Sequence, residues 1–333
     1  MRLSISALYV LIAVPALLTG CGGGPSTPTA LLQQNELHSA KHASGPCPCL
    51  YVANNQGQSV TVYASGATGN AKPIQTIAGN NTFLGSPEDV AVDAGGNIYV
   101  ANAGGNSVTV YAAGASGNVA PIRAITGSNT GLDTPFGIAL DPLNGDIYVT
   151  NNSNSTVTVY APSANGNVAP IATIGGGSTG LAFPDNVALD VSGNIYVTNF
   201  FNTVTIYAAN ANGNVPPMRT IAGTHTKLSD PYGIAVDSTF KIYVANYADR
   251  SVTVYAAGAN GNKKPIQSIS GPMTKLKEPM GIAIDGADNI YTANETYNWI
   301  TVYTAGSTGN VPPMNTIKGK KTGLNIPLGI AVR

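Results

Sequence analysis

Six copies of one short phrase, four strand-like runs in each copy and an unpaired final run together predict an all-β fold, a six-bladed β-propeller. The phrase Leu-Tyr-Val-Ala-Asn at residues 50–54 recurs with small changes at spacings of 48, 49, 48, 47 and 48 residues. Repeats of this length, each with several short strands, are typical of propeller blades and not of short-period solenoids. An apolar fraction of 43% is enough for a packed core.

The second copy shows the four runs that each blade is expected to contain. They cover residues 90–93, 97–102, 107–112 and 121–126, with Gly, Pro, Asn or Ser between them. The first run is apolar with small residues, which suits an inner strand buried on both faces. The third run alternates apolar and polar residues, which predicts a half-exposed strand. The fourth run begins at a proline, which an edge strand tolerates.

The two ends of the repeat array predict how the ring closes. The first copy lacks a first run, because the repeats begin at Leu50 in a second run. The last segment, residues 329–332, is a first run without successors. Pairing this C-terminal strand with the three N-terminal strands completes a sixth four-stranded blade over residues 50–333, so we expect six blades.

The units resemble NHL repeats. Residues 231–237 read Pro-Tyr-Gly-Ile-Ala-Val-Asp, residues 241–246 read Lys-Ile-Tyr-Val-Ala-Asn, and an alternating run follows at 251–255. The resemblance covers residues 50–333 and implies a propeller, but it does not imply one function, because such folds serve enzymes, RNA binders and interaction platforms. The sequence departs from the NHL pattern in having Asn where Asp is usual at the end of the second run, which removes most support for a ring of calcium-binding carboxylates. These residues are Asn54, Asn102, Asn151, Asn199, Asn246 and Asn294.

The N-terminus has the features of an export signal. Arg2 precedes an apolar run at residues 8–18, which is too short to span a bilayer of about 30 Å. Leu18-Thr19-Gly20-Cys21 resembles the bacterial lipoprotein box, which implies a signal peptide at residues 1–20, cleavage before Cys21 and acylation of Cys21 with chains such as palmitate. Residues 21–49 then form a flexible tether. The alternative is an ordinary signal peptide with an incidental cysteine.

This resemblance implies a location in the bacterial cell envelope. The lipid would anchor the protein to a membrane, the outer one if the organism is Gram-negative, because Gly22 and not Asp follows Cys21. The propeller itself would be extracytoplasmic. In the tether, Cys47 and Cys49 flank Pro48. A disulfide, an intermolecular bridge and free thiols all remain open for this pair.

The charge content excludes one class of partner. Only 10% of the residues are charged, and 16 Lys and Arg balance 16 Asp and Glu. Such a chain has no electrostatic footprint for nucleic acid. The oligomeric state is not set by any sequence feature, and a monomer is expected.

Residues that occur in every unit are expected to serve the fold. An aspartate ends the first run at Asp93, Asp141, Asp190, Asp237 and Asp285, where its side chain stabilises the following turn. Ser178 lies in a Gly-x-Ser-x-Gly match, but its unit places it in a loop and not in the strand-to-helix elbow that this nucleophile motif needs. His225 is the only histidine of the propeller, so a histidine-rich zinc or lyase site cannot be built.

Four unrepeated polar residues form a candidate metal site. Glu88-Asp89 and Asp185-Asn186 lie two blades apart, after the proline that opens their first runs. Residues at this position are expected to ring the mouth of the central channel. Oxygen ligands suit Ca²⁺, as in gluconolactonase-like propellers, and a bound ion would polarise a carbonyl for hydrolysis. The alternative is that these are solvated loop acids.

A second set of unrepeated residues predicts a ligand-binding face. The loops after the second run are small and polar in the early units and carry aromatic and charged residues in the later ones, and 12 of the 16 basic residues follow residue 218. Clustered exposed aromatics with adjacent charge are typical of interaction surfaces, although drift among the repeats would also produce them. The candidates are Phe200, Phe201, Tyr232, Tyr247, Arg250, Tyr297 and Trp299.

These observations favour a membrane-anchored, extracytoplasmic propeller that acts as a non-catalytic ligand- or protein-binding module. Its partner would be an envelope protein or a glycan, and it would need no cofactor. The alternative is a calcium-dependent, gluconolactonase-like lactonase. A purely structural envelope protein would need no site at all.

Overall fold

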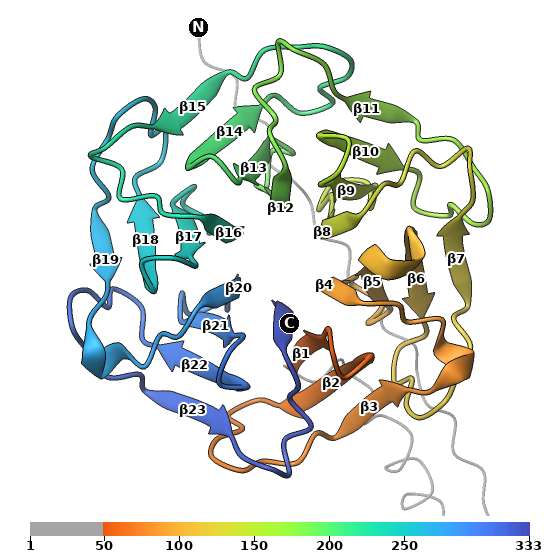
Figure 1. Cartoon of the computed structure of the whole chain (residues 1–333), viewed down its shortest axis with the longest axis horizontal. Coiled ribbons are helices and arrows are strands. Elements are labelled where there is room, and N and C mark those ends of the chain that lie inside the picture. Colours follow the sequence, from red (N-terminus) through yellow and green to blue (C-terminus); the bar gives the residue numbers. More distant parts are fainter. Residues whose placement is uncertain (1–48) are drawn as a thin grey trace, which may run out of the picture. The chain divides into compact units, whose positions relative to one another are not determined.

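A computed structural model describes residues 49–333 and confirms the predicted all-β propeller. Its strands form six four-stranded antiparallel sheets, the blades, arranged in a ring (Figure 1). Helical structure in this range is limited to three single turns, η1 (Asn80–Thr82), η2 (Ala103–Gly105) and η3 (Pro272–Thr274). No helix of these residues has the length and hydropathy of a membrane span. The predicted signal peptide, Cys21 and Cys47 lie outside the described residues.

The two inner strands of each blade surround the channel. The innermost strands contact one another in a closed ring. In the order of blades 1 to 6 they are β24 (Pro327–Val332), β4 (Pro87–Val92), β8 (Pro135–Leu140), β12 (Pro184–Leu189), β16 (Pro231–Val236) and β20 (Pro279–Ile284). The second strands are β1 (Cys49–Asn54), β5 (Ile98–Asn102), β9 (Ile147–Asn151), β13 (Ile195–Asn199), β17 (Ile242–Asn246) and β21 (Ile290–Asn294).

The two outer strands complete each blade. The third strands are β2 (Ser59–Ala64), β6 (Ser107–Tyr111), β10 (Thr156–Tyr160), β14 (Thr203–Tyr207), β18 (Ser251–Tyr255) and β22 (Trp299–Tyr303). The rim strands are β3 (Gln75–Ala78), β7 (Arg123–Thr126), β11 (Ala172–Ile174), β15 (Arg219–Ala222), β19 (Gln267–Ile269) and β23 (Asn315–Lys318). We use "loop face" for the side where rim strands lead to the next inner strand, and "turn face" for the opposite side.

The ring closes as predicted, by pairing of the two ends of the repeat array. β24 pairs with β1, with Val332 opposite Leu50 and Ile330 opposite Val52. β24 is thereby the inner strand of blade 1, whose order is β24-β1-β2-β3. At the rim, Gly69 of blade 1 bridges to Ile317 of blade 6. β1 begins at Cys49, one residue before the predicted start.

Two predictions about the outer strands are wrong. The third strands are buried and not half-exposed; β6, for example, is buried along its whole length. Each blade is packed between two others, so both faces of this strand are covered, and its threonines serve hydrogen bonds inside the protein. The rim strands also begin about two residues after their prolines, at Gln75 in blade 1 and Gln267 in blade 5, because proline has no N–H to donate to the sheet.

The repeated asparagines hold each blade to its own loop. In blade 5 the Asn246 side chain is fully buried. Its Nδ2 donates to Thr253 Oγ1 at 3.0 Å, and its Oδ1 accepts from the Ser229 backbone N–H at 3.2 Å. An amide can donate and accept at once, whereas a carboxylate can only accept. The asparagines therefore have the structural role that their repetition predicted.

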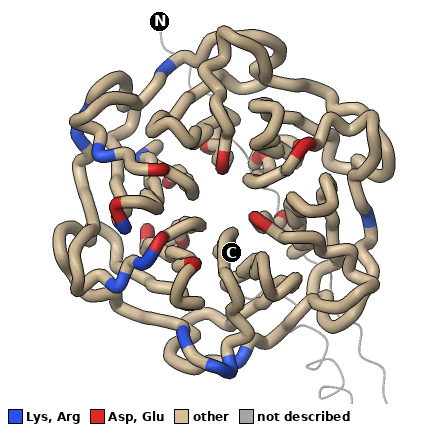
Figure 2. Tube along the Cα trace, viewed as in Figure 1, with Lys and Arg blue, Asp and Glu red and all other residues tan. Residues whose placement is uncertain are grey.

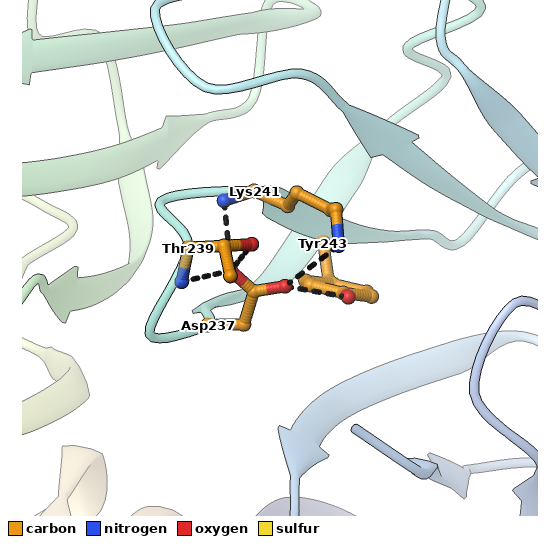
Figure 3. A network of polar contacts seen from close by, with 4 residues as sticks. All are labelled: Asp237, Thr239, Lys241 and Tyr243. Carbon is orange, nitrogen blue, oxygen red and sulfur yellow. Dashed lines mark hydrogen bonds and ion pairs between the residues drawn. The ribbon is translucent and has the colours of Figure 1, made fainter. Parts of the chain in front are cut away.

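The repeated aspartates stabilise the turns, as predicted. Asp237 Oδ1 accepts from the backbone N–H groups of Thr239 and Lys241, and Oδ2 accepts from the Tyr243 hydroxyl at 2.9 Å (Figure 3). Lys241 Nζ lies 3.6 Å from Oδ2. Partial burial raises the pKa of Asp237, but these hydrogen bonds outweigh burial and hold it below its usual value.

Candidate functional site

The channel is plugged near the loop face by two side chains that replace glycines. The third residue of the inner strand is glycine in four blades, because neighbouring inner strands nearly touch there; a Cβ on Gly137 would lie 2.6 Å from the Asn186 Cα. Blades 2 and 4 carry Asp89 and Asn186 instead. Asn186 Nδ2 donates to Asp89 Oδ2 at 3.1 Å, past Gly137 of the blade between them, and the Ile138 N–H donates to the same oxygen.

Above this plug, Glu88 and Tyr232 join opposite sides of the ring. They stand on β4 and β16, three blades and 144 residues apart, and the Tyr232 hydroxyl lies 3.1 Å from Glu88 Oε2. Asn55 Nδ2 donates to Glu88 Oε1 at 2.8 Å. Burial raises the pKa of Glu88 to about 7, and it raises the pKa of Asp89 below it to about 7 as well.

Asp185 is the channel carboxylate with the fewest partners. Its side chain on β12 is 4% exposed. Asn152 Nδ2 lies 3.3 Å from Oδ1, whereas Oδ2 is buried without a hydrogen-bond partner among the described residues. Burial, followed by the nearby charges of Asp230 and Glu88, raises its pKa to about 8. A buried carboxylate in this state favours a ligand that supplies a donor or a positive charge.

The four residues of the candidate calcium site therefore lie in one channel but do not form a ready cation site. They are buried in strands, so their interpretation as solvated loop acids is wrong. Both oxygens of Glu88 and both of Asp89 accept hydrogen bonds from the protein. Among the described residues, no three His, Cys, Asp or Glu side chains are grouped so that they could hold a metal. The donor set as arranged does not fit Ca²⁺, which takes six to eight oxygens.

A pocket of about 530 Å³ opens on the loop face beside these residues. It crosses blades 3 to 6 and is lined by inner-strand starts and by the loops on either side of them. Its lining comprises Phe136, Asn152, Phe183, Asp185, Phe200, Phe201, Asp230, Tyr232, Tyr247, Met280 and Glu295. A cavity of about 340 Å³ lies on the turn face between blades 6 and 1, and its lining includes Leu50, Tyr291 and Arg333.

The aromatic side chains of the pocket contact one another across blades. Phe201 packs edge-on against Phe200 at 5.4 Å and against Phe183 at 6.1 Å between ring centroids. Phe136 of blade 3 lies 6.1 Å from Tyr232 of blade 5. Phe200 and Phe201 are 50% and 59% exposed. Large apolar side chains that are exposed at the rim of a pocket are typical of binding sites.

The predicted binding face divides into two groups. Phe200, Phe201, Tyr232 and Tyr247 line the pocket, whereas Arg250, Tyr297 and Trp299 lie outside its lining. Arg250 forms an ion pair of 3.3 Å with Glu278 of the next blade. In blade 4 the equivalent Asn202 instead accepts from the Asp230 backbone N–H.

Tyr297 and Trp299 form a separate stack with lysines. Their rings are 5.2 Å apart and 19° from parallel. Lys277 Nζ lies 5.6 Å from the Tyr297 ring centroid, and Lys318 Nζ lies 5.4 Å from the Trp299 ring centroid. Trp299 Nε1 is buried without a hydrogen-bond partner among the described residues. The stack is therefore a positively charged aromatic patch, distinct from the pocket.

The predicted site residues did not include six of the lining residues: Phe136, Asn152, Phe183, Asp230, Met280 and Glu295. Phe183 and Asp230 are the residues before the inner-strand prolines, with φ values of 47° and 51°. In all six blades the residue at this position has a left-handed backbone conformation, so its side chain leaves the backbone in the same direction in every blade. The signal available in the sequence was the change at this position from Ser86 and Thr134 to large or charged residues in the four later units.

Opposite charges occupy different parts of the ring. Acidic residues gather toward the centre and most Lys and Arg lie toward the rim (Figure 2). The pocket lining follows this pattern, since it includes Asp185, Asp230 and Glu295 and neither lysine nor arginine. The basic enrichment of the later units therefore does not make the pocket basic.

Sequence comparison places the chain in a family. The profile of the SMP-30/Gluconolactonase/LRE-like region matches residues 48–215, just over half of the chain. The protein belongs to this family. The resemblance of its single repeats to NHL repeats stays a prediction. No curated protein matches the sequence.

Solved structures share the fold at low identity. A protein of unknown function from Bacteroides caccae superimposes with a TM-score of 0.63 at 10% identity, covering 86% of this chain and 98% of that one. A chain of the Nidogen/Laminin complex superimposes with a TM-score of 0.62 at 16% identity, covering 85% of this chain and 97% of that one. The virginiamycin B lyase from Staphylococcus aureus gives 0.55 at 15% identity, covering 85% and 88%. At these identities the likeness shows the fold alone.

Proposed function

We propose that the protein is a non-catalytic binding module whose loop-face pocket takes up a small ligand. The observation that carries this proposal is the pocket itself: it measures about 530 Å³ and is lined by aromatic side chains at positions where most of the other units have no aromatic residue. Most ligand sites are pockets of this size with apolar walls and a few polar groups. The repeated residues hold the blades, so this unrepeated set has no comparable structural role.

A neutral fluorophore tests this proposal on the full chain. Nile red should gain fluorescence on entering the pocket, and Phe200→Ser with Phe201→Ser should reduce that gain about tenfold, because the apolar wall is lost. Leu143→Ser is the matched control, since Leu143 is 67% exposed in a turn of the opposite face. Equal loss in the control, or no loss in the double variant, would contradict the proposal.

For its location, we propose a lipid anchor on Cys21 that displays the propeller in the cell envelope. The support is the box Leu18-Thr19-Gly20-Cys21. Acylation at more than one position gives stable membrane attachment, whereas a single chain does not. Cys21→Ser should therefore release the protein from the membrane fraction or block its processing. Unchanged fractionation and processing would refute the anchor.

For its partner, we propose that the Tyr297–Trp299 stack contacts an acidic envelope glycan. Aromatic rings stack on sugar faces, and Lys277 and Lys318 supply positive charge beside them. Trp299 is the sole tryptophan, so its fluorescence reports this patch alone. An acidic polysaccharide should change the emission, and Lys277→Gln with Lys318→Gln should abolish the change. A neutral polysaccharide is the control.

The second candidate is a lactonase-like hydrolase, favoured by the family and by the partnerless oxygen of Asp185. Gluconolactone hydrolysis, measured with and without Ca²⁺, tests it; activity that Asp185→Asn abolishes would replace the non-catalytic proposal. Ca²⁺-dependent thermal stabilisation is the binding control. The lyase neighbours offer no third candidate, since one is described as inactivated by loss of a histidine. Here the only histidine of residues 49–333, His225, is exposed and outside the pocket lining.

A further inference from the structure

The charge around the loop-face pocket is one-sided. Asp185, Asp230 and Glu295 contribute carboxylates to its lining. Two basic side chains in loops of the same blades have other partners: Arg250 pairs with Glu278, and Lys277 lies over the Tyr297 ring. A ligand in this pocket therefore meets three carboxyl groups and no lysine or arginine among the lining residues, and a cationic ligand would favour the ionised form of these groups.

The carboxylates lie among aromatic rings. Phe200 and Phe201 meet edge to face at 5.4 Å between ring centroids, and Phe183 lies 6.1 Å from Phe201. Phe136 and Tyr232 form a second aromatic pair of the lining, at 6.1 Å. Aromatic faces attract cations through their quadrupole, and quaternary ammonium groups are bound in this way. An anion would face repulsion from both the rings and the acids. A wholly neutral apolar ligand would leave the buried Asp185 Oδ2 without a partner.

Asp185 gives the pocket a point of attachment. Its Oδ2 is buried at the pocket wall without a hydrogen-bond partner among the described residues. Burial raises its pKa to about 8, because ionising the buried carboxyl costs free energy when no positive charge lies beside it. A positively charged ligand group beside this oxygen would lower that cost. A hydrated metal ion would not use the apolar walls, whereas an organic cation would use both features.

We propose that the pocket selects an organic cation, an ammonium group carried on an apolar or aromatic body. The proposal deepens the proposed binding function and rests on it. The ammonium lies against Asp185 and Asp230, and the body packs on Phe200 and Phe201.

Calorimetry on the full chain with a cationic probe and a neutral probe of the same shape tests whether the pocket prefers a positively charged ligand. Choline and dimethylbutanol, its neutral isostere with carbon in place of nitrogen, differ only in charge. Choline should bind about tenfold more tightly. Benzyltrimethylammonium should bind more tightly than choline, because its ring adds apolar contact.

Asp230→Asn isolates the contribution of one carboxylate. Asp230 has a φ of 51°, which asparagine also tolerates, so the loop should keep its shape. The variant should bind benzyltrimethylammonium about fivefold more weakly. The control is Asp288→Asn, which removes the same charge at a φ of 60° in a turn of the opposite face and should have no effect.

The outcomes distinguish failure of the cation preference from failure of the proposed binding function. Equal affinity for choline and dimethylbutanol, an absence of binding by benzyltrimethylammonium, or equal effects of the two Asn variants would each overturn the cation preference. Nile red uptake that depends on Phe200 and Phe201 would then still support a binding pocket. Nile red uptake that does not depend on Phe200 and Phe201 would contradict both the binding pocket and the cation preference.

Discussion

The two ends of the inner strands carry carboxylates in opposite environments. At the turn face, Asp93, Asp237 and Asp285 accept several hydrogen bonds, which outweigh partial burial and hold their pKa values low. At the loop face, burial raises the pKa values of Glu88 and Asp89 to about 7 and of Asp185 to about 8. The first set repeats around the ring and the second does not.

This difference separates residues that serve the fold from residues available for function. Hydrogen bonds to an ionised carboxylate stabilise the folded state. The turn aspartates accept these bonds from residues a few positions further along the chain, as Asp237 does from Thr239, Lys241 and Tyr243. The channel acids are buried at a cost that the fold does not require, since glycine or apolar residues occupy the same positions in other blades. Of these acids Asp185 lines the pocket, and a perturbed pKa in a pocket marks a candidate functional residue.

The strongest test removes one inner strand together with both of its ends. Deleting residues 326–333 takes away β24, leaves blade 1 with three strands and exposes the edge of β1. We expect loss of cooperative unfolding or a large fall in Tm, far beyond the roughly 1 kcal/mol typical of a point substitution. A truncated chain that melts within a few degrees of the full one would break the description of a closed ring.

Removing one turn aspartate should destabilise the protein. Asp237→Ala deletes the acceptor for two backbone N–H groups and the Tyr243 hydroxyl, and we expect a loss of about 2 kcal/mol at neutral pH. Because its folded pKa is low, this contribution is present above about pH 4 and is lost as the pH falls further. Urea denaturation measures it. Exposed Asp249→Ala is the control and should change little.

Removing a channel acid should stabilise the protein at high pH, in contrast to removing a turn aspartate. A raised folded pKa means that the folded state holds the proton more tightly, so stability falls as the pH rises from about 4 to about 8. Asp185→Asn cannot ionise, and we expect it to be more stable than the native chain by a few kcal/mol at about pH 9, since one unit of pKa shift corresponds to about 1.4 kcal/mol. The difference should vanish below about pH 4. A variant that is less stable at both pH values would show that Asp185 serves the fold.

The smallest effect is expected where an unrepeated aromatic is truncated. Phe200→Ala should change the free energy of unfolding by less than about 0.5 kcal/mol, since the side chain is half-exposed. Tyr255→Phe is the contrasting variant: it removes a buried hydroxyl that donates to the Thr226 carbonyl at 2.8 Å, at a cost of about 1 kcal/mol. Denaturation of both variants ranks them, and the reverse order would contradict the division between repeated and unrepeated residues.

Much of the fold was readable from the sequence because it is encoded within single repeats. Burial, turn chemistry and strand pairing act over a few residues, so six similar units determine six similar blades. The closing pair β24 and β1 followed from the register of the repeats alone. The exposure of the third strands was not predictable in this way, because a strand's own alternation does not show that other blades cover both of its faces.

The sequence by itself determined the blade count, the closure and the structural roles of the repeated Asn and Asp residues. Only the tertiary structure decided that Glu88 meets Tyr232 across the channel, that Asp89 and Asn186 plug it, and that four aromatic candidates share a pocket from which Arg250, Tyr297 and Trp299 are separate. The physical reason is distance along the chain. These contacts join residues of different blades, so they depend on the radius of the closed ring and on side-chain direction, which no single repeat encodes.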